Sequence, residues 1–164
     1  MEHLWAPWRM AYVTKASPPA GCAFCHAPAM EDDERAHILH RGRWNFVIMN
    51  IYPYNNGHLM IVPFSHLSSP TDSPKEQTDE LMDLLKTCQR VLTAAYGPQG
   101  FNIGMNLGQC AGAGVLDHYH LHIVPRWYGD TNYVTVVSET RVLIEDLDQT
   151  YQKLRPLFCV EAMS

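Results

Sequence analysis

Short apolar runs and two longer apolar stripes divide the chain into expected strands and helices. The runs have the length and composition of strands, and Gly42 separates the first two by a tight turn. The expected strands are residues 37–41, 44–50, 58–63, 101–107 and 118–125, with a further short extended piece at 134–137. Because a short turn can join only antiparallel neighbours, the sheet is expected to be mostly antiparallel.

Two segments have the spacing of amphipathic helices. Over residues 75–96, apolar side chains recur every three or four positions and form one stripe, and Gly97-Pro98 ends it. A second helix is expected over residues 140–158, with Pro156 near its end. Strands followed by a helix, more strands and a final helix predict an α+β fold, with the helices on one face of the sheet.

Length and composition are those of one globular domain. The 164 residues are expected to form a single domain over 1–164. Its first part, residues 1–21, is expected to be an extended arm and contains three prolines and two tryptophans. The formal net charge of −5 argues against a broad nucleic-acid surface. No apolar run approaches the about 18 residues of a membrane span, and no signal peptide is visible, so a cytoplasmic protein without membrane or nucleic-acid partners is expected.

Three of the nine histidines alternate within five residues, as His118, His120 and His122. Alternate residues of a strand share one face, so these imidazoles are expected together, with Tyr119 and Leu121 facing a core. Three imidazoles would be costly to bury in an apolar core, whereas on an open face they line a site.

Two kinds of chemistry fit this histidine face. Alternating histidines can hold a catalytic zinc. Alternatively, one imidazole attacks phosphorus while its neighbours donate hydrogen bonds to the phosphate oxygens. The small residues Gly112, Ala113 and Gly114 lie in the preceding loop, where backbone N–H groups could approach a phosphate closely. This loop favours phosphorus chemistry.

Two of the five cysteines form a Cys-x-x-Cys pair, Cys22 and Cys25. In a cytoplasmic protein this spacing is typical of a metal or redox pair rather than a structural disulfide. As one edge of a tetrahedral zinc site it needs two further ligands. His26 is a poor candidate because it is adjacent to Cys25.

The segment His118-Tyr119-His120-Leu121-His122-Ile123-Val124 resembles the signature of the histidine triad (HIT) family of nucleotide-binding hydrolases and transferases. Asn50, the Gly57-His58 pair and the small-residue loop occur in family order. The resemblance covers residues 22–127, and the flanks resemble a bacterial branch related to diadenosine tetraphosphate phosphorylases. It implies a HIT-like fold with a five-stranded sheet, and a homodimer.

The resemblance also implies roles for individual residues. His120 would attack the α-phosphate and form a nucleotidyl-histidine, with its ring oriented by the carbonyl of His118. His122 and His58 would line the phosphate site. The nucleoside would contact a further set: Asn50 at the ribose, Ile48 and Met60 as apolar walls, and Asn106 beside the phosphates.

Two other features follow from the resemblance. Zinc-binding relatives carry histidines at the positions of His66 and His118, which with Cys22 and Cys25 would complete a structural Cys₂His₂ zinc site. Many members also read Gly-Gln-Ser or Gly-Gln-Thr before the triad, where this chain has Ala113-Gly114-Val115. The missing amide and hydroxyl leave the leaving group open, with Gln109 as a weak substitute.

The expected activity is therefore hydrolysis or phosphorolysis of dinucleoside polyphosphates through a covalent intermediate on His120. Three alternatives stay open. The chain could hydrolyse a nucleoside phosphoramidate or adenylate, bind a mononucleotide with little turnover, or act as a histidine-based metal hydrolase.

Overall fold

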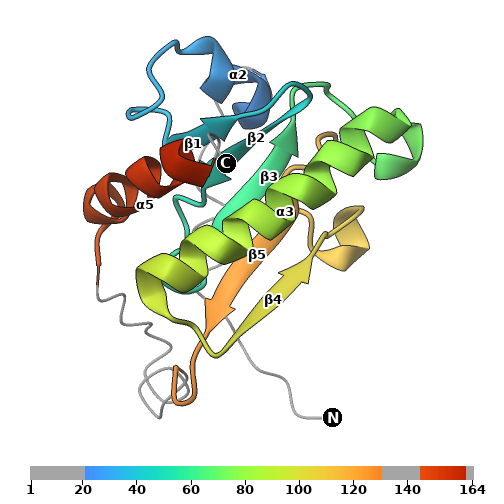
Figure 1. The fold of residues 1–164 in the computed structure, drawn as a ribbon. Coiled ribbons are helices and arrows are strands. Elements are labelled where there is room, and N and C mark those ends of the chain that lie inside the picture. The colour runs from blue at the N-terminus through green and yellow to red at the C-terminus, as the bar shows by residue number, and fades with distance from the viewer. Residues whose placement is uncertain (1–20, 131–144, 162–164) are drawn as a thin grey trace, which may run out of the picture.

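The structure is a computed structural model and describes residues 21–130 and 145–161. Five strands form one sheet in the order β1-β2-β3-β5-β4, and every neighbouring pair is antiparallel (Figure 1). The strands are β1 (Ile38–Arg41), β2 (Asn45–Met49), β3 (Leu59–Pro63), β4 (Gly100–Gly104) and β5 (Leu121–Arg126). The expected α+β class and five-stranded antiparallel sheet are confirmed.

Two long helices lie on one face of this sheet, as Figure 1 shows. They are α3 (Lys75–Tyr96) and α5 (Leu147–Glu161), and the short helix α2 (Ala23–Ala29) lies near β1 and β2. Two single 3₁₀ turns, η1 (Pro70–Asp72) and η2 (Gln109–Ala111), complete the elements of the described ranges. No helix within these ranges is long and apolar enough to cross a membrane.

Alternation along the strands divides the core into two clusters. In β2, Val47 and Met49 belong to the larger cluster with the apolar stripes of α3 and α5. Phe46 and Ile48 belong to a smaller cluster on the other side, which includes Phe24 of α2. The period of two in a strand produces this division, and it leaves the smaller cluster beside the histidine face.

Several expected boundaries are wrong by a few residues. The strand expected at 101–107 is Gly100–Gly104. The last helix begins at Leu147 because the carboxylate of Asp146 accepts the N–H of Gln149 and caps it, and it continues past Pro156 to Glu161. Most of the arm at 1–21, the piece at 134–137 and the expected helix start lie outside the described residues.

Two differences bear on the site. Helix α2 was not expected, because seven residues containing Pro28 show no helical periodicity; it forms as the Cys22 carbonyl accepts the N–H groups of Cys25 and His26. Strand β5 begins at Leu121 rather than at 118, because the N–H of Tyr119 donates to the carbonyl of Leu67, outside the strand ladder.

Candidate functional site

The strand register brings predicted site residues from three strands into one row. Ile48 of β2 pairs with Met60 of β3, and Met60 pairs with His122 of β5. Directly paired residues of antiparallel strands point to the same face. Ile48 and Met60 therefore form an apolar floor next to His122, and both are largely buried.

His120 lies just before β5 with a defined proton position. Its Nδ1 is 3.1 Å from the carbonyl oxygen of His118, which can only accept a hydrogen bond. In the neutral ring, Nδ1 therefore carries the proton and Nε2 carries the lone pair. Burial lowers the pKa of His120, and the bond to the His118 carbonyl opposes that shift without cancelling it. The ring is thus held neutral, with the lone pair on Nε2.

His58 and His122 form a hydrogen-bonded pair whose direction is also fixed. The N–H of Tyr54 donates to Nδ1 of His58 at 3.0 Å, so the proton of the His58 ring is on Nε2. That Nε2–H donates to Nδ1 of His122 at 2.9 Å. His122, when neutral, therefore carries its proton on Nε2. Its ring lies 4.7 Å from that of His120, so a ring whose Nε2 carries a proton lies beside a ring whose Nε2 carries a lone pair.

Two aromatic residues that the sequence analysis did not assign to the site flank this row. The ring of Phe24 lies 4.7 Å from that of His120 and 5.6 Å from that of His118. Tyr54 packs against His58 at 4.6 Å and against His122 at 5.9 Å. The position of Phe24 between the two cysteines was the available signal, since any ligand that gathers those thiols also positions Phe24.

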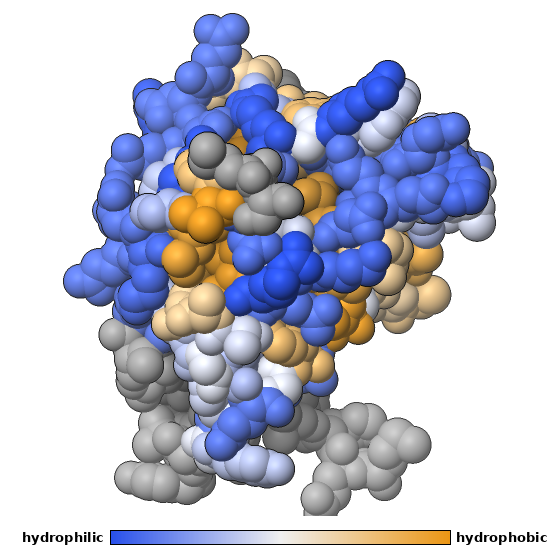
Figure 2. All heavy atoms as spheres, viewed as in Figure 1, coloured by the Kyte–Doolittle hydropathy of each residue, from blue (hydrophilic) through white to orange (hydrophobic). Residues whose placement is uncertain are grey.

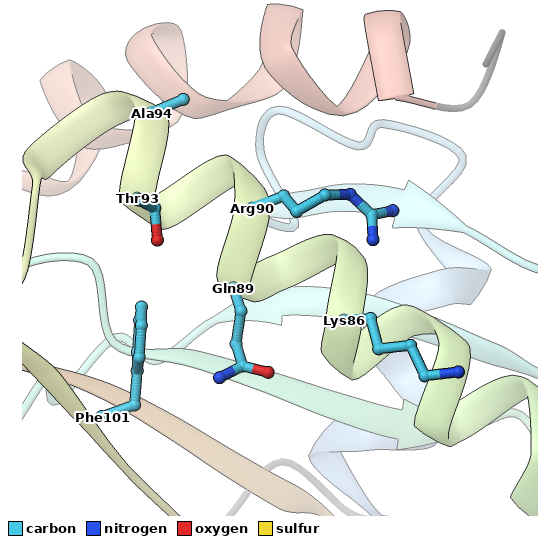
Figure 3. Close-up of a pocket in the computed structure, with 6 residues that line it drawn as sticks. All are labelled: Lys86, Gln89, Arg90, Thr93, Ala94 and Phe101. Atoms are coloured by element: carbon cyan, nitrogen blue, oxygen red, sulfur yellow. The ribbon is translucent and has the colours of Figure 1, made fainter.

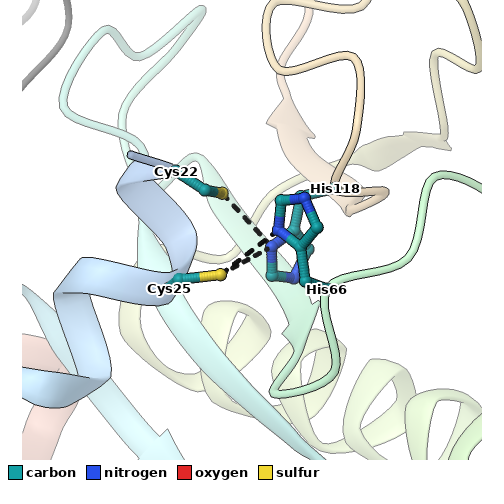
Figure 4. Close-up of side chains that lie close together, drawn as sticks. All are labelled: Cys22, Cys25, His66 and His118. Atoms are coloured by element: carbon teal, nitrogen blue, oxygen red, sulfur yellow. Dashed lines mark hydrogen bonds between the residues drawn. The ribbon is translucent and has the colours of Figure 1, made fainter. Parts of the chain in front are cut away.

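Four side chains from three separate segments point toward one another (Figure 4). The ligand atoms of Cys22, Cys25, His66 and His118 all lie within 4.8 Å of one another. The Sγ of Cys22 is 3.3 Å from Nδ1 of His118, and the Sγ of Cys25 is 3.2 Å from Nδ1 of His66 and 3.6 Å from Nδ1 of His118. His26 is not part of this cluster, although it neighbours Cys25.

These distances fit a tetrahedral metal. Zinc bonds of about 2.3 Å to sulfur and about 2.0 Å to nitrogen separate the sulfur and nitrogen ligands by about 3.5 Å. The protonation of His118 fits as well: its Nε2 lies 2.8 Å from the Pro63 carbonyl and must donate, which leaves the Nδ1 lone pair facing the thiols. The four residues can therefore hold a metal ion of the zinc type, with no position left for substrate.

The glycine-rich loop approaches the same face of the sheet. Val115 at its end packs against the cluster that contains Ile48 and Met60. Within the loop, the N–H groups of Ala111, Gly112 and Ala113 donate to loop carbonyls. Gly112 has a φ of 83°, which favours glycine. Gly114 and Gln109 are exposed, and Asn106 is half-buried just after β4, so the phosphate contacts expected of this loop stay a prediction.

Asn50 lies directly after β2, opposite His58. Its backbone N–H donates to the His58 carbonyl at 3.0 Å, and its side-chain oxygen accepts the N–H of Tyr52 at 2.9 Å. The side-chain nitrogen lies 3.4 Å from Nδ1 of His58. Asn50 is thus fixed at the rim of the histidine row, and its expected contact with a ribose remains a prediction.

A separate hollow of about 550 Å³ lies between α3 and β4, away from the histidines (Figure 3). Its lining includes Lys86, Arg90 and Phe101. Both cations already have acidic partners, Asp83 for Lys86 and Glu161 for Arg90. On the same side of the molecule, hydrophilic side chains predominate along the outer surface of α3 (Figure 2). The hollow therefore does not extend the histidine site.

Comparisons with known proteins identify the family of this chain. The family model described as "HIT domain" matches residues 33–128. A protein of Mycobacterium tuberculosis named AP-4-A phosphorylase is 35% identical over 162 residues, which cover 94% of this chain and 83% of that protein. The adenosine 5'-monophosphoramidase hnt1 of Schizosaccharomyces pombe is 28% identical over 105 residues, covering 64% of this chain and 74% of that protein.

The fold has solved counterparts as well. The crystal structure of a zinc-bound histidine triad family protein from Mycobacterium smegmatis superposes with a TM-score of 0.70 at 23% identity, covering 88% of this chain and 98% of that one. The resemblance inferred from the histidine motif is confirmed: this chain belongs to the HIT domain family.

Proposed function

We propose that this protein is a nucleotidyl-transferring enzyme that cleaves dinucleoside polyphosphates at an α-phosphorus, with His120 as the nucleophile. The observation that carries the proposal is that His120 and His122 carry their ring protons on opposite nitrogens. His120 has its proton on Nδ1 and its lone pair on Nε2, whereas the neighbouring His122 has its proton on Nε2. A nucleophile and a donor side by side are what attack at a phosphate requires.

In the first step, the lone pair on Nε2 of His120 forms a bond to the α-phosphorus. The bond from that phosphorus to the bridging oxygen breaks, and the leaving polyphosphate keeps the electron pair. The carbonyl of His118 stabilises the positive charge that develops on the His120 ring through its bond to Nδ1–H. His122 donates its Nε2–H to the phosphate or to the departing oxygen.

In the second step, water or inorganic phosphate attacks the nucleotidyl-histidine, and the phosphorus–nitrogen bond breaks to restore the neutral ring. Water yields a nucleoside monophosphate, and phosphate yields a nucleoside diphosphate. The proton that the attacking water or phosphate gives up leaves to solvent with the product, and His122 keeps its Nε2–H in place because the Nε2–H of His58 occupies its Nδ1. Ile48 and Met60 would pack against the nucleoside and Asn50 would bind its ribose.

The choice of substrate is supported by the relatives. The AP-4-A phosphorylase matches almost the whole chain, whereas the phosphoramidase matches less of it at lower identity. The absence of a hydroxyl and an amide in Ala113-Gly114-Val115 also fits a substrate whose leaving polyphosphate is stable by itself. We therefore favour dinucleoside polyphosphates over phosphoramidates.

The Cys₂His₂ cluster is proposed as a structural zinc site. Cys22, Cys25, His66 and His118 would hold the ion, which would fix α2 against the segment that carries His120. Bound there, zinc supplies structural restraint. Since all four ligands come from the protein, we assign it no role in activating substrate or water.

The test is His120→Asn, assayed with diadenosine tetraphosphate with and without inorganic phosphate. We expect turnover to fall by at least about 10³-fold. Wild-type protein quenched in acid-free denaturant should carry the added mass of one nucleoside monophosphate on His120. A nucleoside diphosphate formed only with phosphate present would identify phosphorolysis.

The matched control is His26→Asn, which replaces an exposed histidine outside the site and should retain wild-type turnover. Unchanged turnover in His120→Asn would disprove the nucleophile. Tight binding of a mononucleotide with negligible turnover of dinucleotide, phosphoramidate and adenylate would instead favour a binding module. Activity that requires a metal bound at His120 would favour a metal hydrolase.

A further inference from the structure

We propose that Gln77 is the positioning residue that holds the metal cluster and the nucleophile in register, acting through the hydroxyl of Tyr119. The inference rests on the proposed function, since it assigns Gln77 to the same site. Gln77 lies in the first turn of α3, on the opposite side of the sheet from the histidines, and is 1% exposed. It contacts none of the reacting groups directly.

The segment that needs positioning is 118–120, because it lies outside the sheet. Strand pairing holds β5 only from Leu121 onward. Before that point, the N–H of Tyr119 donates to the Leu67 carbonyl at 2.7 Å, and the side chain of Tyr119 turns to the opposite side from those of His118 and His120. Any shift of Tyr119 along the chain therefore moves both histidines.

Tyr119 ends in a polar network centred on the buried side chain of Gln77, with two partly buried serines as its other members. The side-chain nitrogen of Gln77 donates to the Tyr119 hydroxyl and to the Ser73 hydroxyl, at 2.8 Å each. The two hydroxyls are 2.8 Å apart and close a triangle. The side-chain oxygen of Gln77 accepts from the Ser65 hydroxyl at 2.8 Å. Both donors and the oxygen of the amide are thus satisfied by protein partners.

The same glutamine reaches both segments that carry the cluster histidines. Ser65 immediately precedes His66, and Leu67 immediately follows His66. The carbonyl of Leu67 accepts the backbone N–H of Tyr119. The backbone carbonyl of Gln77 also accepts from the side chain of Asn45 in β2. One residue therefore fixes His66, His118 and His120 relative to α3 and to the sheet.

An apolar core would fill this space without the cost of burying an amide and several hydroxyls. A fully satisfied polar network has a different property: it accepts one arrangement of its members, because any slip leaves a buried group without a partner. Metal geometry and in-line attack both depend on such small displacements. This requirement explains why polar side chains, and not apolar ones, occupy the space around Gln77.

The experiment measures zinc affinity and turnover in Tyr119→Phe and Gln77→Leu. Purified holoprotein is titrated with a chromophoric chelator, and kcat and KM are measured for diadenosine tetraphosphate. We expect each variant to lose zinc affinity by about 10-fold or more, with kcat reduced and KM little changed. The double variant should lose no more than Gln77→Leu alone, because both changes act through one contact.

The control is Val91→Ala, a buried position on the same helix outside the network. It should lower the melting temperature while leaving zinc affinity and kcat near wild type. Tyr119→Phe keeps the ring and carries the test if Gln77→Leu does not fold. Zinc affinity and kcat in Tyr119→Phe equal to those of Val91→Ala would overturn the inference.

Failure of the inference can be told apart from failure of the proposed function. If His120 carries no nucleotide in the trapping experiment while Tyr119→Phe still weakens zinc binding, the positioning role stands and the catalytic proposal falls. If wild-type protein retains no zinc, the metal part of both proposals is overturned, and the trapping experiment tests His120 as the nucleophile independently of that result.

Discussion

Backbone groups decide what each imidazole in this site can do. A carbonyl oxygen can only accept, so His118 and His120 must donate from the ring nitrogen that faces one, and an N–H must be accepted by His58. Identical side chains thereby differ in where the ring proton lies: the lone pair of His118 is on Nδ1, facing the thiols, that of His120 is on Nε2, and the proton of neutral His122 is on Nε2. These assignments depend on folding of the segments and not on residue type.

Gly57, next to His58, is required both by its backbone and by its surroundings. Its φ is 71°, and a Cβ there would lie 3.0 Å from the side chains of Leu92 and Tyr96. We expect Gly57→Ala to lower the free energy of unfolding by more than the about 1–2 kcal/mol that the left-handed conformation alone costs. Thermal denaturation followed by circular dichroism measures the loss.

The control is Gly97→Ala at the end of α3. Gly97 has a φ of 54°, and a Cβ there meets nothing within 4 Å. The two variants therefore share the backbone penalty and differ in the contact. Equal losses would show that Leu92 and Tyr96 yield without cost, contrary to this account.

At the level of single residues, the sequence predicted a site residue where a short motif was sufficient to identify it. The triad and the Cys-x-x-Cys pair could be found by spacing alone, and the structure brings the pair together with His66 and His118. Phe24 was signalled only indirectly, by its position between the two cysteines, and spacing did not indicate Tyr54 beside the histidines or Gln77 behind them. Tyr54 packs against His122 and Gln77 bonds to Tyr119, and both partners lie far away in the chain.

Among the elements, the contact between the end of α3 and the start of α5 depends on the carboxylate of Glu145. Glu145 precedes α5 and accepts from the Tyr96 hydroxyl at 2.5 Å and from Thr150 at 3.0 Å, and it pairs with Lys153. Lys153 also lies over the Tyr96 ring, 4.7 Å from its centre. Tyr96 is thereby fixed in the position that excludes a side chain at Gly57.

This arrangement makes the stability of the contact depend on pH. Burial raises the pKa of Glu145, but the bonds from Lys153, Tyr96 and Thr150 outweigh it and leave the pKa below its ordinary value. The folded form therefore binds this proton less tightly than the unfolded chain. Its contribution is present above the unfolded pKa of about 4.3 and is lost as the pH falls through the lower folded value.

We expect Glu145→Gln to lower the melting temperature at pH 7 by about 2–4 °C, as for a loss of about 1 kcal/mol. The difference from wild type should shrink as the pH falls from about 4.3 through the lower pKa of folded Glu145, because the wild-type carboxylate then becomes protonated. Glu31→Gln, which removes the same charge at an exposed position, should show neither effect. A difference that stays constant with pH would exclude the ionised carboxylate as its source.

Element types were predicted well where the pattern was long or repeated, as in α3 and the β1–β2 hairpin. The errors have identifiable causes. Helix α2 is too short to show a period, and the onset of β5 depends on Tyr119 bonding to Leu67 rather than to a neighbouring strand. Local hydrogen bonds to the Cys22 carbonyl form α2, whereas a contact with a distant segment sets the onset of β5, and both segments carry residues of the candidate site.

In the whole molecule, the two long helices and the histidine row lie on opposite faces of the sheet. One face binds α3 and α5 through the larger apolar cluster. The other face carries the histidine row, the smaller cluster and α2. The hydrogen bond between Gln77 and Tyr119, just before β5, connects α3 to the segment that carries His118 and His120. The homodimer expected from the family resemblance stays a prediction.

Metal removal should therefore affect both the fold of α2 and the environment of His120. Without zinc, Cys22 and Cys25 lose their common partner, and Phe24 between them is free to leave the rings of His118 and His120. We expect Cys22→Ser to be purified with much less than one zinc per chain and to melt at a lower temperature, because a ligand that binds only the folded state stabilises it. Metal analysis and thermal denaturation measure both effects.

Cys159→Ser is the matched control, since it removes an exposed thiol of α5 outside the cluster. It should keep the metal content and melting temperature of wild type. Chelation of wild-type zinc should reproduce the lower melting temperature of Cys22→Ser, and added zinc should restore wild type but not the variant. Because the cluster is closed by four protein ligands, the chelated protein should keep part of its turnover. Complete loss of turnover in chelated protein that is still folded would indicate a catalytic metal and contradict a structural role.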